Sequence, residues 1–281
     1  MANHELPLSG KIAYVTGGGS GIGMACARSF LRDGASVMIV GRSVDKLDAA
    51  AEALAPDVTD GASVWARSVD VAEENAVRDS VAAAIELGGG LHLAVAAAGI
   101  GALAPVIATP LPEWQKVIDT NLTGTFLTFK HAGAAIARSG GGAICAISSI
   151  AGVRTHPHGA AYSVSKAGID MLVRNTADEL GQAGVRVNSV CPGLVDTEIC
   201  AGLFATDAVL ADYLDQMPIR RTGTVDDVAE AVRYLCSPQA SWITGVSLSV
   251  DGGEHLRRGP DWSPLARMLH GDDAVEGRHA P

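Results

Sequence analysis

Short apolar runs alternate with longer alanine-rich segments along the chain, and this alternation limits the fold more than any other feature. Runs rich in apolar or β-branched residues, short enough for strands, span 12–15, 37–40, 64–66, 91–96, 143–147, 185–190 and 246–250. The segments with helical periodicity are 21–33, 45–54, 73–87, 113–138, 160–180 and 225–236. Such alternation predicts a seven-stranded, doubly wound parallel α/β sheet with helices on both faces and ligands at the carboxyl ends of its strands.

The composition is that of one large domain. The chain has 281 residues, 48% of them hydrophobic, and no Pro-rich or Ser-rich linker divides it. Its 31 acidic residues outnumber its 21 basic ones, which gives a formal net charge of −10. A surface of this sign repels phosphates, so we expect no nucleic-acid partner.

The sequence predicts neither a membrane segment nor a metal site. The apolar runs are far shorter than the roughly 20 residues that a membrane span needs, and residues 1–10 lack the pattern of a signal peptide. We therefore expect a cytoplasmic protein. The five cysteines have no disulfide or zinc spacing. His156 and His158 have no third ligand at a suitable spacing, so we expect them at a cleft wall or subunit contact.

A glycine-rich turn follows the first predicted strand. Gly17, Gly21 and Gly23 have the spacing Gly-x-x-x-Gly-x-Gly and open the first predicted helix. Because these residues lack side chains, backbone amides at a helix N-terminus can approach the pyrophosphate of a dinucleotide. An ordinary glycine-rich turn is the alternative, but the place between a strand and a helix favours binding. The residues of the turn that we predict to contact a dinucleotide are Gly17, Gly19, Ser20, Gly21, Ile22 and Gly23.

Tyr162 and Lys166 lie four residues apart on a predicted helix, and Ser149 ends the buried run before it. Residues at this spacing share a helix face, so the Lys166 ammonium can lie beside the Tyr162 phenol and favour the phenolate. Bringing a tyrosine pKa from ~10 toward neutrality takes a shift of roughly 3 units, or about 4 kcal/mol. The arrangement is typical of an acid–base site, and the alternative is an ordinary packed pair.

These residues together resemble the short-chain dehydrogenase/reductase family, and the likeness runs from about Lys11 to Gly253. Further matching stretches are Asp70 after the third strand, Asn121 in 119–124, and the segments 191–197 and 250–253. The resemblance implies a single Rossmann-type domain. One departure stands at Ala97, where the family usually has the Asn of an Asn-Ala-Gly turn that ties neighbouring strands. We expect this change to affect local rigidity, since Gly99 and the backbone of the turn remain.

The resemblance also implies roles for individual residues. Ser149 would donate a hydrogen bond to the substrate oxygen while Tyr162 delivers or removes the proton. Lys166 would lower the Tyr162 pKa and hold the nicotinamide ribose, and Asn121 would help to order a water that reloads the proton. The expected cofactor contacts beyond the glycine turn are Arg42, Asp70, Val71, Gly99, Tyr162, Lys166, Pro192, Gly193 and Thr197.

Two of these contacts have plain structural alternatives. Asp70, expected to accept a hydrogen bond from the adenine amino group, could instead cap the following helix. Pro192, Gly193 and Thr197, expected to frame the nicotinamide, could form an ordinary Pro-Gly turn. Their position after a predicted strand and facing the predicted catalytic helix favours the functional interpretation.

The end of the second predicted strand favours NADP(H) as the cofactor. The segment 40–43 offers no carboxylate to a ribose 2′-hydroxyl, whereas Arg42 could pair with a 2′-phosphate. Ser20 stands where many NADP-dependent relatives have a second basic residue. NAD(H) therefore stays open as the alternative.

The activity implied is that of an oxidoreductase that interconverts a carbonyl and a secondary alcohol by hydride transfer. One alternative is a dinucleotide-binding regulator without turnover, which the intact set of Ser149, Tyr162, Lys166 and Asn121 disfavours. Another is epimerase or dehydratase chemistry of the same superfamily, which the compact length disfavours.

Two segments concern substrate and assembly. Residues 199–217 are rich in apolar side chains and predict a mobile flap over a lipophilic pocket that suits 3-oxoacyl thioesters, steroids or other ketones. We place the catalytic domain at 1–253.

Residues 254–281 form an extension that is either disordered or a short amphipathic segment docked on its own body or on a neighbouring subunit. The resemblance implies a homo-oligomer, a tetramer, with this extension and the last strand among its contacts.

Overall fold

A parallel sheet forms the centre of the computed structural model, which describes residues 6–59, 61–258 and 261–278. Within these ranges the sheet has seven strands in the order β3-β2-β1-β4-β5-β6-β7, and every neighbouring pair is parallel. The strands are β1 (Ile12–Thr16), β2 (Ser36–Gly41), β3 (Val64–Ser68), β4 (Leu93–Ala96), β5 (Gly142–Ile147), β6 (Val185–Pro192) and β7 (Ser247–Val250). The predicted Rossmann-type fold is therefore confirmed.

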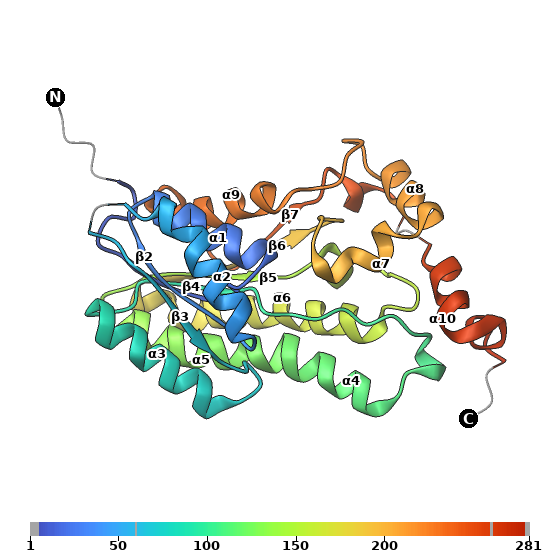
Figure 1. The fold of residues 1–281 in the computed structure, drawn as a ribbon, viewed down its shortest axis with the longest axis horizontal. Helices are drawn as coiled ribbons and strands as arrows, with labels where there is room; N and C mark the ends of the chain where they lie inside the picture. Colours follow the sequence, from blue (N-terminus) through green and yellow to red (C-terminus); the bar gives the residue numbers. More distant parts are fainter. Residues whose placement is uncertain (1–5, 60, 259–260, 279–281) are drawn as a thin grey trace.

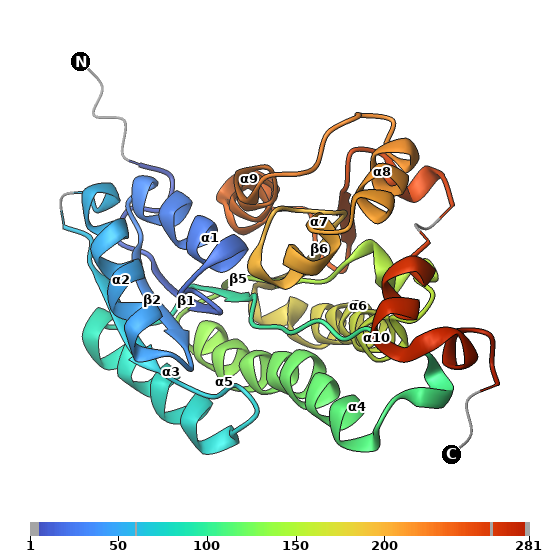
Figure 2. The same ribbon diagram turned by 45° about the vertical axis from the view of Figure 1, so that its right-hand side comes forward.

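Helices cover both faces of the sheet. The helices are α1 (Gly21–Arg32), α2 (Val44–Leu54), α3 (Glu74–Gly88), α4 (Leu111–Ile118), α5 (Gly124–Arg138), α6 (Ala160–Leu180), α7 (Ala201–Phe204), α8 (Asp207–Gln216), α9 (Val225–Cys236) and α10 (Ser263–Val275). Residues of α1, α2 and α9 share one buried cluster with the sheet, and residues of α3, α5 and α6 share the other. Figures 1 and 2 show these two groups on opposite sides of the sheet.

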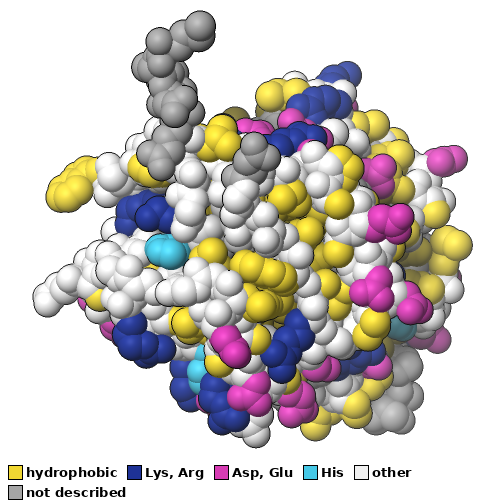
Figure 3. Space-filling model, turned by 60° about the vertical axis from the view of Figure 1, so that its left-hand side comes forward, with side chains coloured by type: hydrophobic (Ala, Val, Ile, Leu, Met, Phe, Trp, Pro, Cys, Tyr) yellow, Lys and Arg dark blue, Asp and Glu magenta, His cyan; other side chains and the backbone are white. Residues whose placement is uncertain are grey.

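Burial on both faces explains why the strands are continuous apolar runs. Side chains alternate along a strand, so Ala13 and Val15 of β1 face one helix layer while Ile12 and Tyr14 face the other. The buried Tyr14 hydroxyl is satisfied by the Ser80 hydroxyl of α3 at 2.7 Å. The surface mixes charges of both signs, and Figure 3 shows basic and acidic side chains interspersed on one face.

Most element boundaries agree with the sequence predictions to within a residue or two. The strand predicted at 91–96 begins only at Leu93, since the backbone N–H of Leu91 bonds to the Ser139 hydroxyl at 3.0 Å instead of a neighbouring strand. The helical segment predicted over 113–138 is present, but it is not a regular α-helix throughout. The structure has α4, a π-helical turn at Asp119–Thr123 and then α5.

The π-helical turn brings Asn121 into the interior, where its side chain is fully buried. The Asn121 amide oxygen accepts from the Ile100 N–H at 2.8 Å, and its nitrogen donates to the Ile100 carbonyl at 3.0 Å. Directly after this turn, the helix backbone at Gly124 approaches Val71 closely. A Cβ at Gly124 would lie 2.6 Å from the Val71 side chain. A wide turn inside a helix is a common device at functional sites, and here it holds the loop after β4.

Ala97 lacks the side chain that usually links neighbouring strands at this turn. A residue of β1 makes a link between β1 and the turn after β4 instead. The Thr16 hydroxyl oxygen, at the end of β1, accepts hydrogen bonds from the backbone N–H groups of Ala97 and Ala98, each at 3.1 Å. Both amides would otherwise lack this partner in a half-buried turn. The loss of rigidity expected at this turn is therefore offset by Thr16.

The extension after Gly253 docks on its own chain. A short 3₁₀ helix at Glu254–Leu256 is followed by Trp262, which is 7% exposed, and by α10. Residues 1–5, 60, 259–260 and 279–281 lie outside the described residues, and the expectations for these parts of the domain and the extension stay untested. Figure 2 shows α10 beside the end of the molecule that carries α8 and the start of α6.

We predict that Thr16→Val will destabilise the protein by about 2 kcal/mol, because two half-buried backbone amides lose their acceptor. This corresponds to a fall in Tm of about 5 °C, measured by calorimetry. Thr16→Ser keeps the acceptor and serves as the control. Equal Tm values for the two variants would show that the tie contributes nothing.

Candidate active site

The carboxyl ends of the central strands surround a cavity of about 840 Å³. Its walls come from the turn after β1, the loop after β4, the end of β5, the start of α6 and the segment after β6. The strand order reverses between β1 and β4, so the cavity lies at the switch point where ligands bind in doubly wound sheets. His156 lines the cavity, which confirms its expected place at a cleft wall.

The structure brings Ser149, Tyr162 and Lys166 together in this cavity. Ser149 follows β5, and its hydroxyl oxygen accepts a hydrogen bond from the Ala151 N–H at 3.1 Å. Tyr162 and Lys166 lie one turn apart near the start of α6, and the Lys166 Nζ is 5.4 Å from the centre of the Tyr162 ring. The same Nζ donates to the Ile147 carbonyl at 2.7 Å. A hydroxyl, a phenol and an ammonium therefore face one space.

Burial sets the acid–base properties of this group. It raises the pKa of Tyr162 to about 12, against the hydrogen bond of Ser149, which lowers it. Burial also lowers the pKa of Lys166 to about 8, while the charge of Asp170 acts in the opposite direction. The expectation that Lys166 brings the Tyr162 pKa toward neutrality is therefore corrected. Both groups lose hydration on burial, and this is the largest cause of each shift.

Asp170 is a buried carboxylate that the sequence interpretation missed. It lies one turn beyond Lys166 on α6 and is 3% exposed. Its Oδ1 accepts from the Ser189 hydroxyl at 2.8 Å. An acidic residue four positions after Lys166 is on the same helix face, and this spacing could have identified it.

The turn after β1 fits a dinucleotide pyrophosphate. Gly17 has φ +65°, and a Cβ there would lie 2.9 Å from the Ala97 backbone. A Cβ at Gly23 would lie 2.3 Å from the Gly17 carbonyl oxygen. The first turn of α1 contains no acidic residue, and Ser20 at its N-cap makes no side-chain cap hydrogen bond. Its amides are therefore free to bind an anion on the cavity side.

Most of the expected cofactor residues line the cavity. They are Gly17, Ser20, Gly21, Ile22, Gly23, Arg42, Gly99, Tyr162, Lys166, Pro192, Gly193 and Thr197. Arg42 is exposed and directly follows β2. The set spans the sheet edge from β2 to β6, which is the extended shape that a dinucleotide requires.

Four expected site residues do not line the cavity. A Cβ at Gly19 would lie 3.5 Å from the Lys46 side chain of α2. The Asp70 Oδ1 accepts from the Ala72 N–H at 3.0 Å in a turn before α3, whose N-cap is Glu73, so Asp70 is not that helix's cap. Val71 is buried against α5.

Asn121 is the fourth. Besides the Ile100 backbone, its amide nitrogen contacts the Ser165 hydroxyl at 3.1 Å, so its side chain is committed to neighbouring residues. A Cβ at Gly99 would lie 3.4 Å from the Asn121 Oδ1 and 3.7 Å from the Lys166 Nζ. Asn121 is thus adjacent to the cavity wall at Gly99.

The far side of the cavity is apolar. Ile199, Leu203 and Tyr213 of the predicted flap line it, and so do Trp262 and Leu265 of the extension. The flap contains α7 and α8, and several of its residues form a small buried cluster of their own. The buried members of this cluster are Leu194, Val209, Tyr213, Met217 and Trp262.

Glu254 lies behind the segment after β6, and nothing in the sequence indicated it. Its side chain is fully buried, and neither carboxyl oxygen has a hydrogen-bond partner among the described residues. Burial, with the nearby charge of Asp251, raises the pKa of Glu254 to about 7. A Cβ at Gly193 would lie 2.7 Å from the Glu254 Oε2.

The described residues contain neither a candidate membrane span nor a candidate metal site. No helix in residues 6–59, 61–258 and 261–278 combines the length and hydropathy needed to cross a bilayer. In the same ranges, no group of three or more His, Cys, Asp or Glu is placed to hold a metal ion. The cysteines are free.

A nicotinamide-dependent oxidoreductase is the class that this fold and cavity define. A family model described as enoyl-(acyl carrier protein) reductase matches residues 17–255. A short-chain type dehydrogenase/reductase from Mycobacterium ulcerans has a solved structure with a TM-score of 0.93 and 39% identity, covering 97% of this chain and 99% of that one. The chain belongs to the short-chain dehydrogenase/reductase family.

Relatives with named substrates are also similar. A cis-4-hydroxycyclohexanecarboxylate dehydrogenase from Sinomonas cyclohexanicum is 38% identical over 244 residues, which are 86% of this chain and 96% of that protein. A 7α-hydroxysteroid dehydrogenase, solved with NADH and 7-oxo glycochenodeoxycholic acid, has a TM-score of 0.84 and 32% identity, covering 90% of this chain and 98% of that one. The protein is an NAD(P)-dependent enzyme that interconverts a carbonyl and an alcohol, and neither alternative activity is favoured.

We predict that Lys166→Met will change how stability depends on pH. Below about pH 8 the ammonium is charged in the folded and unfolded states, so its burial cost is constant. Between about pH 8 and 10.5 the unfolded state binds more protons, so the wild-type protein gains stability that the Met variant does not. Urea unfolding should show the wild type gaining about 2 kcal/mol on the variant between roughly pH 7 and 10. A constant difference between the two proteins would contradict the buried-ammonium assignment.

Proposed function

We propose that the protein reduces a ring-borne ketone, or oxidises the corresponding secondary alcohol, with NADP(H). The observation that carries this proposal is the convergence of Ser149, Tyr162 and Lys166 on the cavity that also receives the first turn of α1. A nicotinamide ring supplies or accepts the hydride in this chemistry. The chain's own residues hold the substrate oxygen and move the proton.

Ser149 and Tyr162 act on the substrate oxygen. The Ser149 oxygen already accepts from Ala151, so its proton is available to donate to a carbonyl. The raised pKa keeps Tyr162 protonated at neutral pH, which suits a general acid that gives its proton to the oxygen as the carbon is reduced. In oxidation the same phenol must first lose its proton.

Lys166 and Asn121 support these two groups. The Lys166 ammonium lies beside Tyr162 and stabilises the phenolate left after proton transfer, and it is also close enough to the cavity wall to bind a ribose hydroxyl. Asn121 is a positioning residue, since its side chain forms hydrogen bonds with the Ile100 backbone and the Ser165 hydroxyl. We place the ordering of a proton-reloading water at this junction.

Arg42 supports NADP(H) over NAD(H). It lines the cavity directly after β2, at the place where an acidic residue would bind a ribose 2′-hydroxyl. Lys46, the next basic residue, is paired with Glu198 across the cavity mouth. NAD(H) is the alternative, because the similar 7α-hydroxysteroid dehydrogenase was solved with NADH.

The apolar far wall supports a lipophilic substrate. Leu203, Tyr213 and Trp262 line the part of the cavity away from the glycine turn. Among the similar proteins, one is named for a hydroxycyclohexanecarboxylate and another was solved with a bile acid. A substrate with an apolar ring suits this wall better than a polar substrate does, since burying apolar area contributes about 25 cal/mol per Å².

We further propose a cytoplasmic homotetramer with a catalytic domain at 1–253. Free cysteines are typical of a reducing compartment. Phe126 of α5 and Val164 and Met171 of α6 are 46%, 48% and 52% exposed, and apolar side chains on neighbouring helices support a subunit contact there. Light scattering on a sizing column tests the assembly, and a monomer would overturn it.

Tyr162→Phe should lower kcat about 1000-fold, because general acid catalysis is lost while the ring remains. Cofactor affinity, measured by fluorescence titration, should stay within about twofold, since only the hydroxyl is removed. Tyr234→Phe, at an exposed tyrosine of α9, is the matched control and should leave kcat unchanged. Unchanged turnover in the Tyr162 variant would exclude the acid–base role.

Arg42→Ala should weaken NADPH binding about 10- to 100-fold, because a charge-assisted pair with the 2′-phosphate is removed. NADH binding should change by less than about twofold, since NADH lacks that phosphate. Arg32→Ala removes an exposed arginine that pairs with Asp57 away from the cavity, and it controls for charge. Tighter NADH than NADPH binding by the wild-type protein would reverse the assignment.

A further inference from the structure

Residues 261–275, which we call the C-terminal cap, lie beyond the segment that matches the family model. We propose that this cap is the outer wall of the substrate pocket and that Trp262 determines specificity by contacting an apolar ring of the substrate. The inference rests on the proposed function, because it takes the cavity as the place where a ketone or alcohol is reduced or oxidised.

Trp262 is held in place by three elements of its own chain. Its indole N–H donates to the Tyr213 hydroxyl of α8 at 3.0 Å, and its ring lies 5.2 Å from the His156 ring at 55°. A Cβ at Gly159 would lie 2.6 Å from the indole, so only glycine fits beneath it. Gly159 directly precedes α6, three residues before Tyr162. The indole therefore packs against the base of the helix that carries the proposed catalytic groups.

The rest of the cap contributes apolar side chains to the cavity wall and two hydrogen bonds to the body of the protein. Leu265 and Leu269 of α10 line the cavity together with Trp262. The Ser263 hydroxyl bonds to His158 at 3.2 Å, and His270 bonds to the Leu103 carbonyl at 2.8 Å. Each of these contacts places α10 over the cavity rather than away from it.

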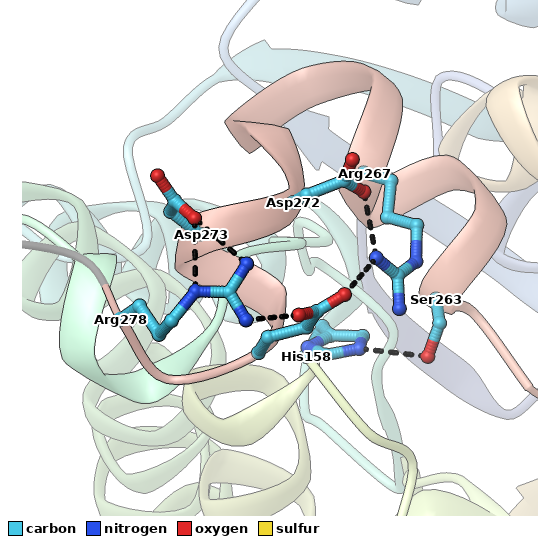
Figure 4. Close-up of polar contacts among 7 residues, drawn as sticks. His158, Ser263, Arg267, Asp272, Asp273 and Arg278 are labelled. Atoms are coloured by element: carbon cyan, nitrogen blue, oxygen red, sulfur yellow. Dashed lines mark hydrogen bonds and ion pairs between the residues drawn. The ribbon is translucent and has the colours of Figure 1, made fainter.

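The ion pairs of the helix are internal to the cap and the residues that follow it. Arg267 pairs with Asp272 at 2.6 Å and with Glu276 at 2.9 Å, and Arg278 pairs with Asp273 at 2.9 Å. Figure 4 shows these pairs next to the contact between His158 and Ser263. The charges therefore pair with one another, and the residues of the cap that line the cavity are Trp262, Leu265 and Leu269.

A ring fits this wall better than a flexible chain. An indole is a flat and rigid surface, and a rigid ring stacked on it loses less conformational freedom on binding than an alkyl chain of the same carbon number. The carbonyl carbon must lie at Tyr162 while the remaining skeleton reaches Trp262. Because Gly159 sets the indole close to the start of α6, the ring that bears the reacting carbon is the one that contacts it.

The test compares 2-decalol with 2-decanol, a fused-ring and a linear alcohol with the same number of carbon atoms. We expect Trp262→Ala to lower kcat/KM for 2-decalol at least tenfold and that for 2-decanol less than threefold. Trp262→Phe should keep most of the activity, because it retains a ring and loses only the bond to Tyr213. Met268→Ala, at a residue of α10 that is 77% exposed, is the matched control and should equal wild type. An equal loss of kcat/KM for both alcohols would overturn the inference that Trp262 selects for a ring.

Calorimetry of 2-decalone binding to the cofactor-loaded protein separates this inference from the proposed function. If the wild type oxidises neither alcohol but binds 2-decalone, and Trp262→Ala weakens that binding at least tenfold, the proposed chemistry fails and the cap inference stands. Equal binding by wild type and Trp262→Ala, or no binding by the wild type, would overturn the cap inference. Circular dichroism of each variant excludes loss of fold as the cause.

Discussion

The hydrogen bond from the Lys166 ammonium to the Ile147 carbonyl holds the site together, because it joins the end of β5 to α6. A second bond runs between the same elements, from the Ser148 hydroxyl to the Lys166 carbonyl at 3.2 Å. Ser149 directly follows Ser148, and Tyr162 lies one helical turn before Lys166, so the two bonds fix the separation of Ser149 and Tyr162. A buried ammonium is a poor contributor to stability, and its position beside the phenol points to chemistry as the reason for it.

A second network connects this anchor to the neighbouring strand. Asn121 holds the loop after β4 through Ile100 and reaches α6 through Ser165. This geometry requires the π-helical turn, because a regular helix over the same residues would direct the side chain differently. Thr16 adds a third contact, since its hydroxyl at the end of β1 accepts from the backbone N–H of Ala97 after β4. The carboxyl ends of β1, β4 and β5 are thus held by side chains as well as by strand pairing.

The parts that could be predicted from sequence are those with a local cause. Strands buried on both faces have continuous apolar runs, and the glycine turn and the spacing of Tyr162 and Lys166 follow from backbone geometry. The π-helical turn, the Thr16 tie and the role of Gly159 depend on residues far apart in the chain, and a single sequence does not show them. The direction of the Tyr162 pKa was mispredicted for the same reason, since burial is a property of the whole fold.

The apolar groups at the far side of the cavity form a core that is separate from the two cores of the sheet. Leu194, Tyr213 and Trp262 pack with one another, whereas the residues on either face of the sheet pack with the flanking helices. Packing energy in one cluster depends mainly on contacts within that cluster. The substrate wall can therefore change in sequence without disturbing the sheet that positions the cofactor turn and α6. In our proposal the substrate therefore depends on the flap and the C-terminal cap, whereas the motifs on the sheet edge and α6 indicate the chemistry.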